Sequence, residues 1–114
     1  MSTAVAFKNV DILFGDHIPA VSSTKPFTGH TTSAAGSIEA IFSILCLQHK
    51  VMWPNLNFKE QMAELGFSPT EKQITGIPVN VVMSNSFGFG GNDTTLIFKK
   101  INADNAGNAN DKLT

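Results

Sequence analysis

The chain has 114 residues, and its eight Lys and Arg residues against nine acidic residues give a formal net charge of −1. This balance excludes the basic surface that attracts nucleic acids or anionic membranes, so neither partner is expected. The longest apolar run, AIFSILCL, is too short to cross a bilayer, and the N-terminus shows no secretory signal. With one cysteine, Cys46, an internal disulfide is excluded. We expect one small soluble domain in the cytoplasm.

The first part of the chain predicts a short helix followed by a short strand. The pattern from Ala4 to Leu13 is helical, and Gly15 behind it favours a helix end. β-Branched residues beside a proline, followed by polar residues, predict a brief strand from Ile18 to Ser23.

The strongest helical pattern runs from Ser33 to about His49, with Thr32 or Ser33 as its N-cap. Its apolar residues occupy more than one stripe of the helix: Ile38, Ile41, Phe42, Ile44, Leu45 and Leu47. A helix with this pattern must be buried on several sides.

The second half predicts a long loop and then two strands. Residues 51–76 are interrupted by Pro54, Gly66 and Pro69, with room for one helical turn near 60–65. The stretches VNVVMSNS and TTLIFKK are rich in Val, Ile and Thr, and the glycine cluster GFGG between them predicts an antiparallel pair. Residues 101–114 have little to bury, so a disordered tail is expected.

The predicted order, helix–strand–helix–strand–strand, places the chain in the α/β class. Three strands are too thin a layer for a helix that is apolar on most sides, and a small domain buries little of its surface. The sequence therefore predicts a part of something larger.

Two stretches carry a resemblance to a known family. SSTKPFTGHTTSAAGSIEAIFSIL and SNSFGFGGNDTTLIFKK resemble, in order and spacing, the C-terminal portion of β-ketoacyl-acyl-carrier-protein synthases, the condensing enzymes of fatty-acid and polyketide synthesis. The resemblance runs from about Ala4 to Lys100. It implies a domain over residues 1–100 with a partial thiolase-like α/β/α half, no cofactor, and a dimer in the complete enzyme. Its implied partners are acyl carrier protein and acyl and malonyl thioesters.

The resemblance also implies site residues. Lys25 and His30 are similar to the lysine and histidine of the family's Lys-x-x-x-Gly-His motif, and Glu39 to a glutamate that supports the site. The GFGG cluster is similar to the loop that gates the acyl pocket and contributes a backbone N–H to the oxyanion hole. Its residues are Gly88, Phe89, Gly90 and Gly91.

Two of the family's catalytic segments have no match in this sequence: the nucleophilic cysteine and the His-Gly-Thr segment. The resemblance therefore implies that the isolated chain is inactive and needs the N-terminal half of the synthase or a complementary subunit. The alternative function is a non-catalytic partner comparable to chain-length-factor subunits. Retention of Lys25 and His30 favours the condensing enzyme, because a scaffold has no chemical use for them.

His30 has a chemical interpretation of its own. Decarboxylative condensation needs a neutral donor at a thioester carbonyl, where negative charge gathers. A position before a helix N-terminus, with Lys25 near in sequence, favours the uncharged imidazole. Gly29 before it permits an unusual backbone angle.

Each of these residues also has a purely structural interpretation. His30 could be a hydrogen-bonded turn residue, Lys25 a solvated surface charge, and Glu39 part of a structural network, since a buried carboxylate needs partners. The glycine cluster could be a tight hairpin, and its spacing does not fit a dinucleotide-binding fingerprint.

Cys46 and His49 share helical i, i+3 spacing, which raises a metal site or a nucleophile as possibilities. No further Cys or His cluster completes a metal site, so no metal is expected. Cys46 lies between Leu45 and Leu47, whereas a reactive thiolate needs an electropositive, exposed place. We expect a core residue.

Overall fold

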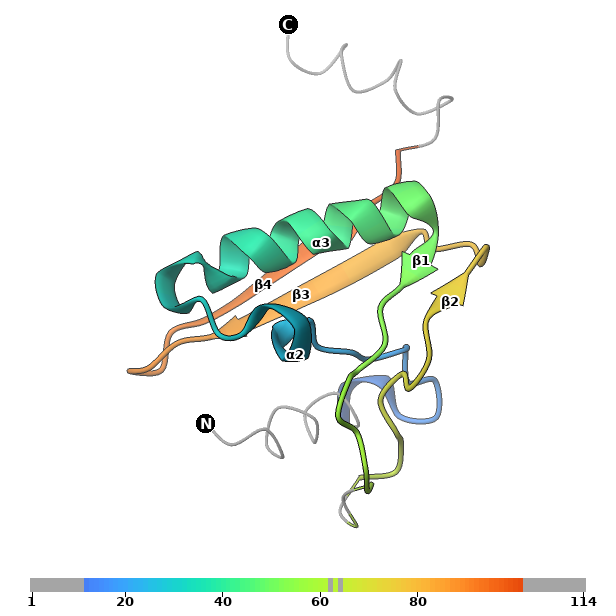
Figure 1. Ribbon diagram of the computed structural model, residues 1–114, viewed down its shortest axis with the longest axis horizontal. Coiled ribbons are helices and arrows are strands. Elements are labelled where there is room, and N and C mark those ends of the chain that lie inside the picture. The colour runs from blue at the N-terminus through green and yellow to red at the C-terminus, as the bar shows by residue number, and fades with distance from the viewer. Residues whose placement is uncertain (1–11, 62, 64, 102–114) are drawn as a thin grey trace, which may run out of the picture.

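The centre of the molecule is one helix lying along a β-hairpin (Figure 1). The computed structural model describes residues 12–61, 63 and 65–101. Its elements are α2 (Lys25–Thr28), the 3-10 turn η1 (Thr32–Ala34), α3 (Ala35–His49), β1 (Val51–Met52), β2 (Ile74–Thr75), β3 (Val81–Phe87) and β4 (Asp93–Lys99). The α/β class is confirmed.

Helix α3 confirms the strongest sequence prediction, with a different start. Neither Thr32 nor Ser33 caps it: the turn η1 precedes the helix, and no side-chain cap bond is present at its N-terminus. The tight turn satisfies the first amides instead, because Ala34 N–H donates to the Thr31 carbonyl oxygen and Ala35 N–H to the Thr32 carbonyl oxygen. The predicted cap was therefore wrong.

The predicted antiparallel pair is confirmed by β3 and β4. The register places Val81 opposite Lys99 and Phe87 opposite Asp93, so all seven residues of each strand are paired. Helix α3 packs on this hairpin through a small residue: a Cβ at Gly36 would lie 3.4 Å from the Ser86 hydroxyl oxygen. The helix and the hairpin therefore approach closely at the N-terminal end of α3.

The core lies around the other end of α3. The buried apolar residues among those described are Cys46, Leu47, Val51 and Leu65. Beside them, the rings of Phe42 and Trp53 meet edge to face, with centroids 6.1 Å apart. Ile41 and Ile44 on the same helix are 58% and 41% exposed. The apolar stripes of α3 are thus only partly covered by the described chain.

The long loop is anchored by a two-stranded ladder that its sequence did not predict. Val51 pairs with Thr75 and Met52 with Ile74, which joins β1 and β2 as an antiparallel pair at the two ends of the loop. Two-residue strands have no periodicity to detect. The described residues of 60–65 form no helix.

The N-terminal predictions have a mixed outcome. Residues 12–14 are helical, and Gly15 with φ +53° follows, while residues 4–11 of the predicted helix lie outside the described residues. The predicted strand from Ile18 to Ser23 is wrong. That segment is bound by single hydrogen bonds, such as Thr70 N–H to the Val21 carbonyl oxygen at 2.8 Å, and has no strand partner in the described part of the chain.

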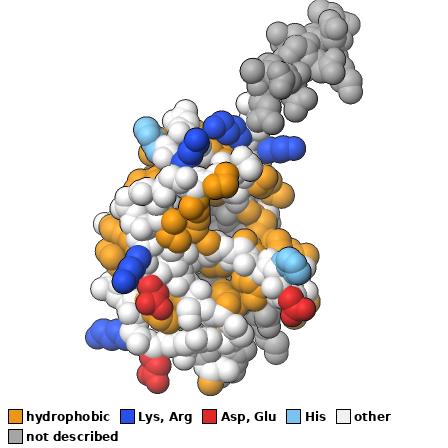
Figure 2. Space-filling model, turned by 90° about the vertical axis from the view of Figure 1, so that its right-hand side faces the viewer, with side chains coloured by type: hydrophobic (Ala, Val, Ile, Leu, Met, Phe, Trp, Pro, Cys, Tyr) orange, Lys and Arg blue, Asp and Glu red, His pale blue; other side chains and the backbone are white. Residues whose placement is uncertain are grey.

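Figure 2 shows apolar side chains in several patches on the face that it presents, between the charged groups. None of the helices in the described part of the chain is both long and apolar enough for a membrane span.

Candidate active site

Lys25 opens the short helix α2, whose sequence is KPFT. Proline suits the first turn of a helix, where its missing N–H costs no hydrogen bond. The Lys25 ammonium forms an ion pair with the Glu39 carboxylate, from the first half of α3. The Glu39 side chain is 16% exposed and the Lys25 side chain 41% exposed. The pair therefore joins a nearly buried carboxylate to a cation at the surface, across 14 positions of sequence.

His30 follows a glycine with an unusual backbone. Gly29 has φ 72° and ψ 179°, a combination that only glycine adopts readily, and it ends α2. The His30 ring then turns towards the chain ahead: its Nδ1 accepts the Thr32 N–H at 3.1 Å. The imidazole therefore satisfies an amide at the start of the helical segment, where a hydroxyl cap was predicted.

This hydrogen bond selects one form of the ring. A nitrogen that accepts an N–H bond carries no proton, so in the neutral imidazole the proton lies on Nε2. His30 is exposed, and Nε2 has no partner within the described residues. In this tautomer the exposed ring leaves its Nε2–H available as a donor.

Thr32, which supplies that amide, has φ 51°. The left-handed region is unfavourable for a β-branched residue, by about 1–2 kcal/mol. Strained residues of this kind persist where surrounding structure fixes them, and they cluster at functional sites. The sequence marks Thr32 only as a candidate cap, and no sequence signal marks its left-handed backbone.

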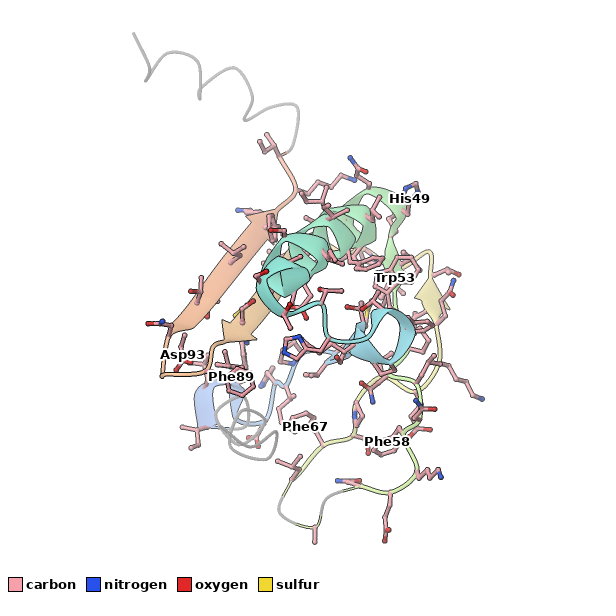
Figure 3. The ribbon with its side chains drawn as sticks, turned by 60° about the vertical axis from the view of Figure 1, so that its left-hand side comes forward. His49, Trp53, Phe58, Phe67, Phe89 and Asp93 are labelled. Carbon is pink, nitrogen blue, oxygen red and sulfur yellow. The ribbon has the colours of Figure 1, made fainter. Side chains whose placement is uncertain are left out.

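The glycine cluster forms the tip of the β3–β4 hairpin. Gly88 N–H donates to the Asn92 carbonyl oxygen at 2.8 Å and Gly91 N–H to the Gly88 carbonyl oxygen at 3.3 Å. Gly90 and Gly91 have φ 102° and 86°, so the tip requires glycine there. Phe89 is 100% exposed, and Figure 3 shows it at the tip beside Asp93.

The backbone amide of Phe89 takes no part in closing this tip. Within the described residues it has no acceptor. It is thus a spare N–H donor on a turn fixed by its neighbours. The structure brings Lys25 and Glu39 into contact, but no hydrogen bond between described residues joins His30 to the glycine cluster.

Cys46 belongs to the core and lies away from these groups. It is 8% exposed, and burial raises the pKa of its thiol, while hydrogen bonding with Trp53 opposes the rise. The Trp53 indole N–H is itself buried and has no hydrogen-bond partner among the described residues. His49 is exposed at the last position of α3 (Figure 3). A buried, protonated thiol agrees with the core role expected for Cys46.

Comparison with known proteins gives this arrangement a family. Residues 5–59 match the family described as "Beta-ketoacyl synthase, C-terminal domain". The chain is 49% identical over 100 residues to 3-oxoacyl-acyl-carrier-protein synthase 1 of Haemophilus influenzae, which covers 85% of this chain and 23% of that protein.

Two further relatives agree. The Escherichia coli protein of the same name is 43% identical over 89 residues, covering 78% of this chain and 22% of the relative. The mitochondrial 3-oxoacyl-acyl-carrier-protein synthase of Arabidopsis thaliana is 42% identical over 106 residues, covering 86% and 22%. The chain thus spans less than a quarter of the length of these relatives. Its small mixed helix and strand fold agrees with part of a thiolase-like α/β unit. The chain therefore belongs to the β-ketoacyl synthase family, of which it carries the C-terminal portion.

Proposed function

We propose that residues 1–100 form the C-terminal part of a β-ketoacyl-acyl-carrier-protein synthase that joins acyl and malonyl thioesters in fatty-acid synthesis. The observation that carries the proposal is the His30 ring, whose Nδ1 accepts the Thr32 N–H and whose Nε2 is left available as a donor. The names of the relatives, which are 3-oxoacyl-acyl-carrier-protein synthases, support the same reaction.

His30 has a defined task in this reaction. Its Nε2–H donates to the thioester carbonyl oxygen of the malonyl unit. As the bond to the carboxylate carbon breaks, carbon dioxide leaves and the electron pair passes through the carbon skeleton to that oxygen, which forms an enolate. A fixed donor at the oxygen that gains charge stabilises this transition state.

The second half of the reaction uses the hairpin tip. The enolate carbon attacks the acyl thioester held on a cysteine of the upstream portion, a C–C bond forms, and the cysteine thiolate leaves. The carbonyl oxygen of the acyl group becomes an oxyanion on the way, and the spare amide of Phe89 is the donor that we assign to it. Gly88, Gly90 and Gly91 give this amide its position and let the tip act as the acyl gate.

Lys25 and Glu39 have a supporting role in the proposal. Their ion pair ties α2 to α3 on either side of His30 in the sequence. The further partners proposed are acyl carrier protein, which delivers the thioesters, and the N-terminal half of the synthase or a complementary subunit, which brings the nucleophilic cysteine. The complete enzyme is proposed to be a dimer.

The test uses a chimera in which this chain replaces the corresponding C-terminal portion of the Escherichia coli relative. His30→Ala should lower the release of carbon dioxide from malonyl thioester about 100- to 1000-fold, the loss typical of one oxyanion-type donor. Transfer of an acyl group to the upstream cysteine should persist. The matched control is His49→Ala, which removes an exposed imidazole at the far end of α3 and should leave the rate unchanged.

The same experiment separates the two functions considered. Normal decarboxylation by His30→Ala would show that His30 only stabilises its turn, and would favour a non-catalytic partner subunit.

A separate experiment tests the isolated chain. Incubation of the 114-residue chain alone with an acyl thioester should add no acyl group by intact mass, because its single thiol is buried.

A further inference from the structure

We infer that Asn55 is a positioning residue that fixes the turn carrying Lys25. The catalytic consequence of this inference rests on the proposed function, but the contacts and their test do not. Asn55 lies in the long loop between β1 and β2, 32 positions from the residue that its side chain contacts.

Three hydrogen bonds join Asn55 to two other segments of the chain. Its Oδ1 accepts the Ser23 N–H at 3.2 Å, and its own N–H donates to the Thr70 carbonyl oxygen at 2.6 Å. Thr70 in turn donates its N–H to the Val21 carbonyl oxygen at 2.8 Å. Segments 21–23, 55 and 70 are thereby joined in a ring, and we call this ring the Asn55 clasp.

The clasp holds Ser23, which lies two positions before Lys25. Ser23 is bound by Asn55 through its N–H, and its Oγ accepts the Lys25 N–H at 3.3 Å. Ser23 therefore transmits the position of the loop to the first residue of α2. An amide oxygen suits this task, because it accepts in the geometry of a backbone carbonyl.

Packing cannot replace the clasp at this position. Helix α2 has four residues, none of them buried, and its N-cap residue Thr24 makes no side-chain cap bond. A helix this short is not stable by itself, so its place depends on the bonds at its ends. Its C-terminal end is closed by Gly29, and its N-terminal end by Ser23.

The consequence falls on the Lys25–Glu39 pair. Glu39 is carried by α3, whose C-terminal half is anchored in the core, so the carboxylate has a fixed place. Lys25 meets it only if α2 is held at the right distance. Loss of the Asn55 side-chain bond should loosen Lys25 and leave α3 and the hairpin in place.

The test measures amide hydrogen exchange and the competitive acetylation of lysines in the full chain by mass spectrometry. Asn55→Ala should raise exchange at Ser23 and Lys25, and acetylation of Lys25 relative to Lys99, about two- to tenfold, the range expected for one hydrogen bond. Asn55→Asp, which keeps an acceptor oxygen, should restore both values.

Controls separate this role from a general loss of structure. Asn80→Ala removes an exposed amide side chain, and among the described residues Asn80 bonds only through its backbone carbonyl oxygen, so this variant should change neither value. Amide protection in β3 reports whether the fold persists. Should Asn55→Ala also lose that protection, Ser23→Ala decides: it leaves Asn55 intact and should still raise exchange and acetylation at Lys25.

The inference fails if Lys25 is unchanged in Asn55→Ala while β3 stays protected, or if Asn55→Asp behaves like Asn55→Ala. It also fails if Ser23→Ala leaves Lys25 unchanged. Neither readout needs turnover, so failure of the proposed enzymatic function would leave this result standing.

Discussion

The two ends of α3 are held in place by different forces. Near its C-terminus, Cys46 and Leu47 are buried together with Val51. Near its N-terminus, Lys25, Glu39 and His30 are placed by an ion pair and hydrogen bonds, and two of these three side chains stay open to solvent. Apolar burial gives stability without direction, whereas hydrogen bonds give direction at a small net gain. Helix α3 therefore has a C-terminal end anchored by apolar burial and an N-terminal end where hydrogen bonds and an ion pair orient polar side chains.

The largest effect should follow from breaking the anchored end. Leu47→Ala removes a side chain that is 8% exposed, and loss of a buried leucine costs about 2–5 kcal/mol. Ile41→Ala on the same helix removes a side chain that is 58% exposed and should cost under about 1 kcal/mol. Urea denaturation followed by the helical circular dichroism signal measures both. Equal losses would show that the two ends do not differ in this way.

A second difference concerns how the stability of the chain depends on pH. Burial raises the pKa of the Cys46 thiol, so the folded chain keeps this proton at pH values where the unfolded chain releases it. The stability should therefore be full below the ordinary thiol pKa of about 8.5 and should fall as the pH rises towards the folded value. The slope can reach about 1.4 kcal/mol per pH unit for one proton.

Urea melts between about pH 7.5 and 9.5 test this, because lysines titrate above that range. Cys46→Ala lowers the stability at every pH, since it removes a buried group, but it should abolish the slope. A slope that persists in Cys46→Ala would assign the pH dependence to another group.

At the polar, N-terminal end of α3, by contrast, one substitution should raise the stability. Thr32→Gly keeps the N–H that His30 accepts and relieves a left-handed β-branched residue, so stability should rise by about 0.5–1 kcal/mol after the entropy of glycine is deducted. Thr31→Gly is the matched control: Thr31 has φ −83°, so only the entropic loss applies and stability should fall. A thermal melt with both variants decides the sign.

The sequence was sufficient for elements whose pattern is long and local. The helix ending at His49 and the hairpin around GFGG have strong periodicity and a clear turn signal, and both are present. The β1–β2 ladder joins two pairs of residues far apart in sequence, and the predicted strand at 18–23 has only isolated bonds. Such pairings leave no local pattern.

The candidate site likewise has parts that the sequence predicted and parts that it did not. Resemblance to a family supplied Lys25, His30, Glu39 and the glycine cluster. The polar contacts that orient them, from Thr32 and Asn55, depend on a left-handed backbone and on a contact across 32 positions. Propensity places threonine at a cap, and the histidine ring took that role instead.

The close approach of Gly36 to Ser86 also has a consequence for synthesis of the chain. Helix α3 is complete at His49, whereas its sheet begins at Val81, roughly 30 residues later. At about 5–20 residues per second, translation takes roughly 2 to 6 s to cover that interval. During those seconds the helix has been made and the strands on which it packs have not. Ribosome-bound chains should therefore be most prone to aggregation, and most dependent on chaperones, while the loop after β1 is being translated.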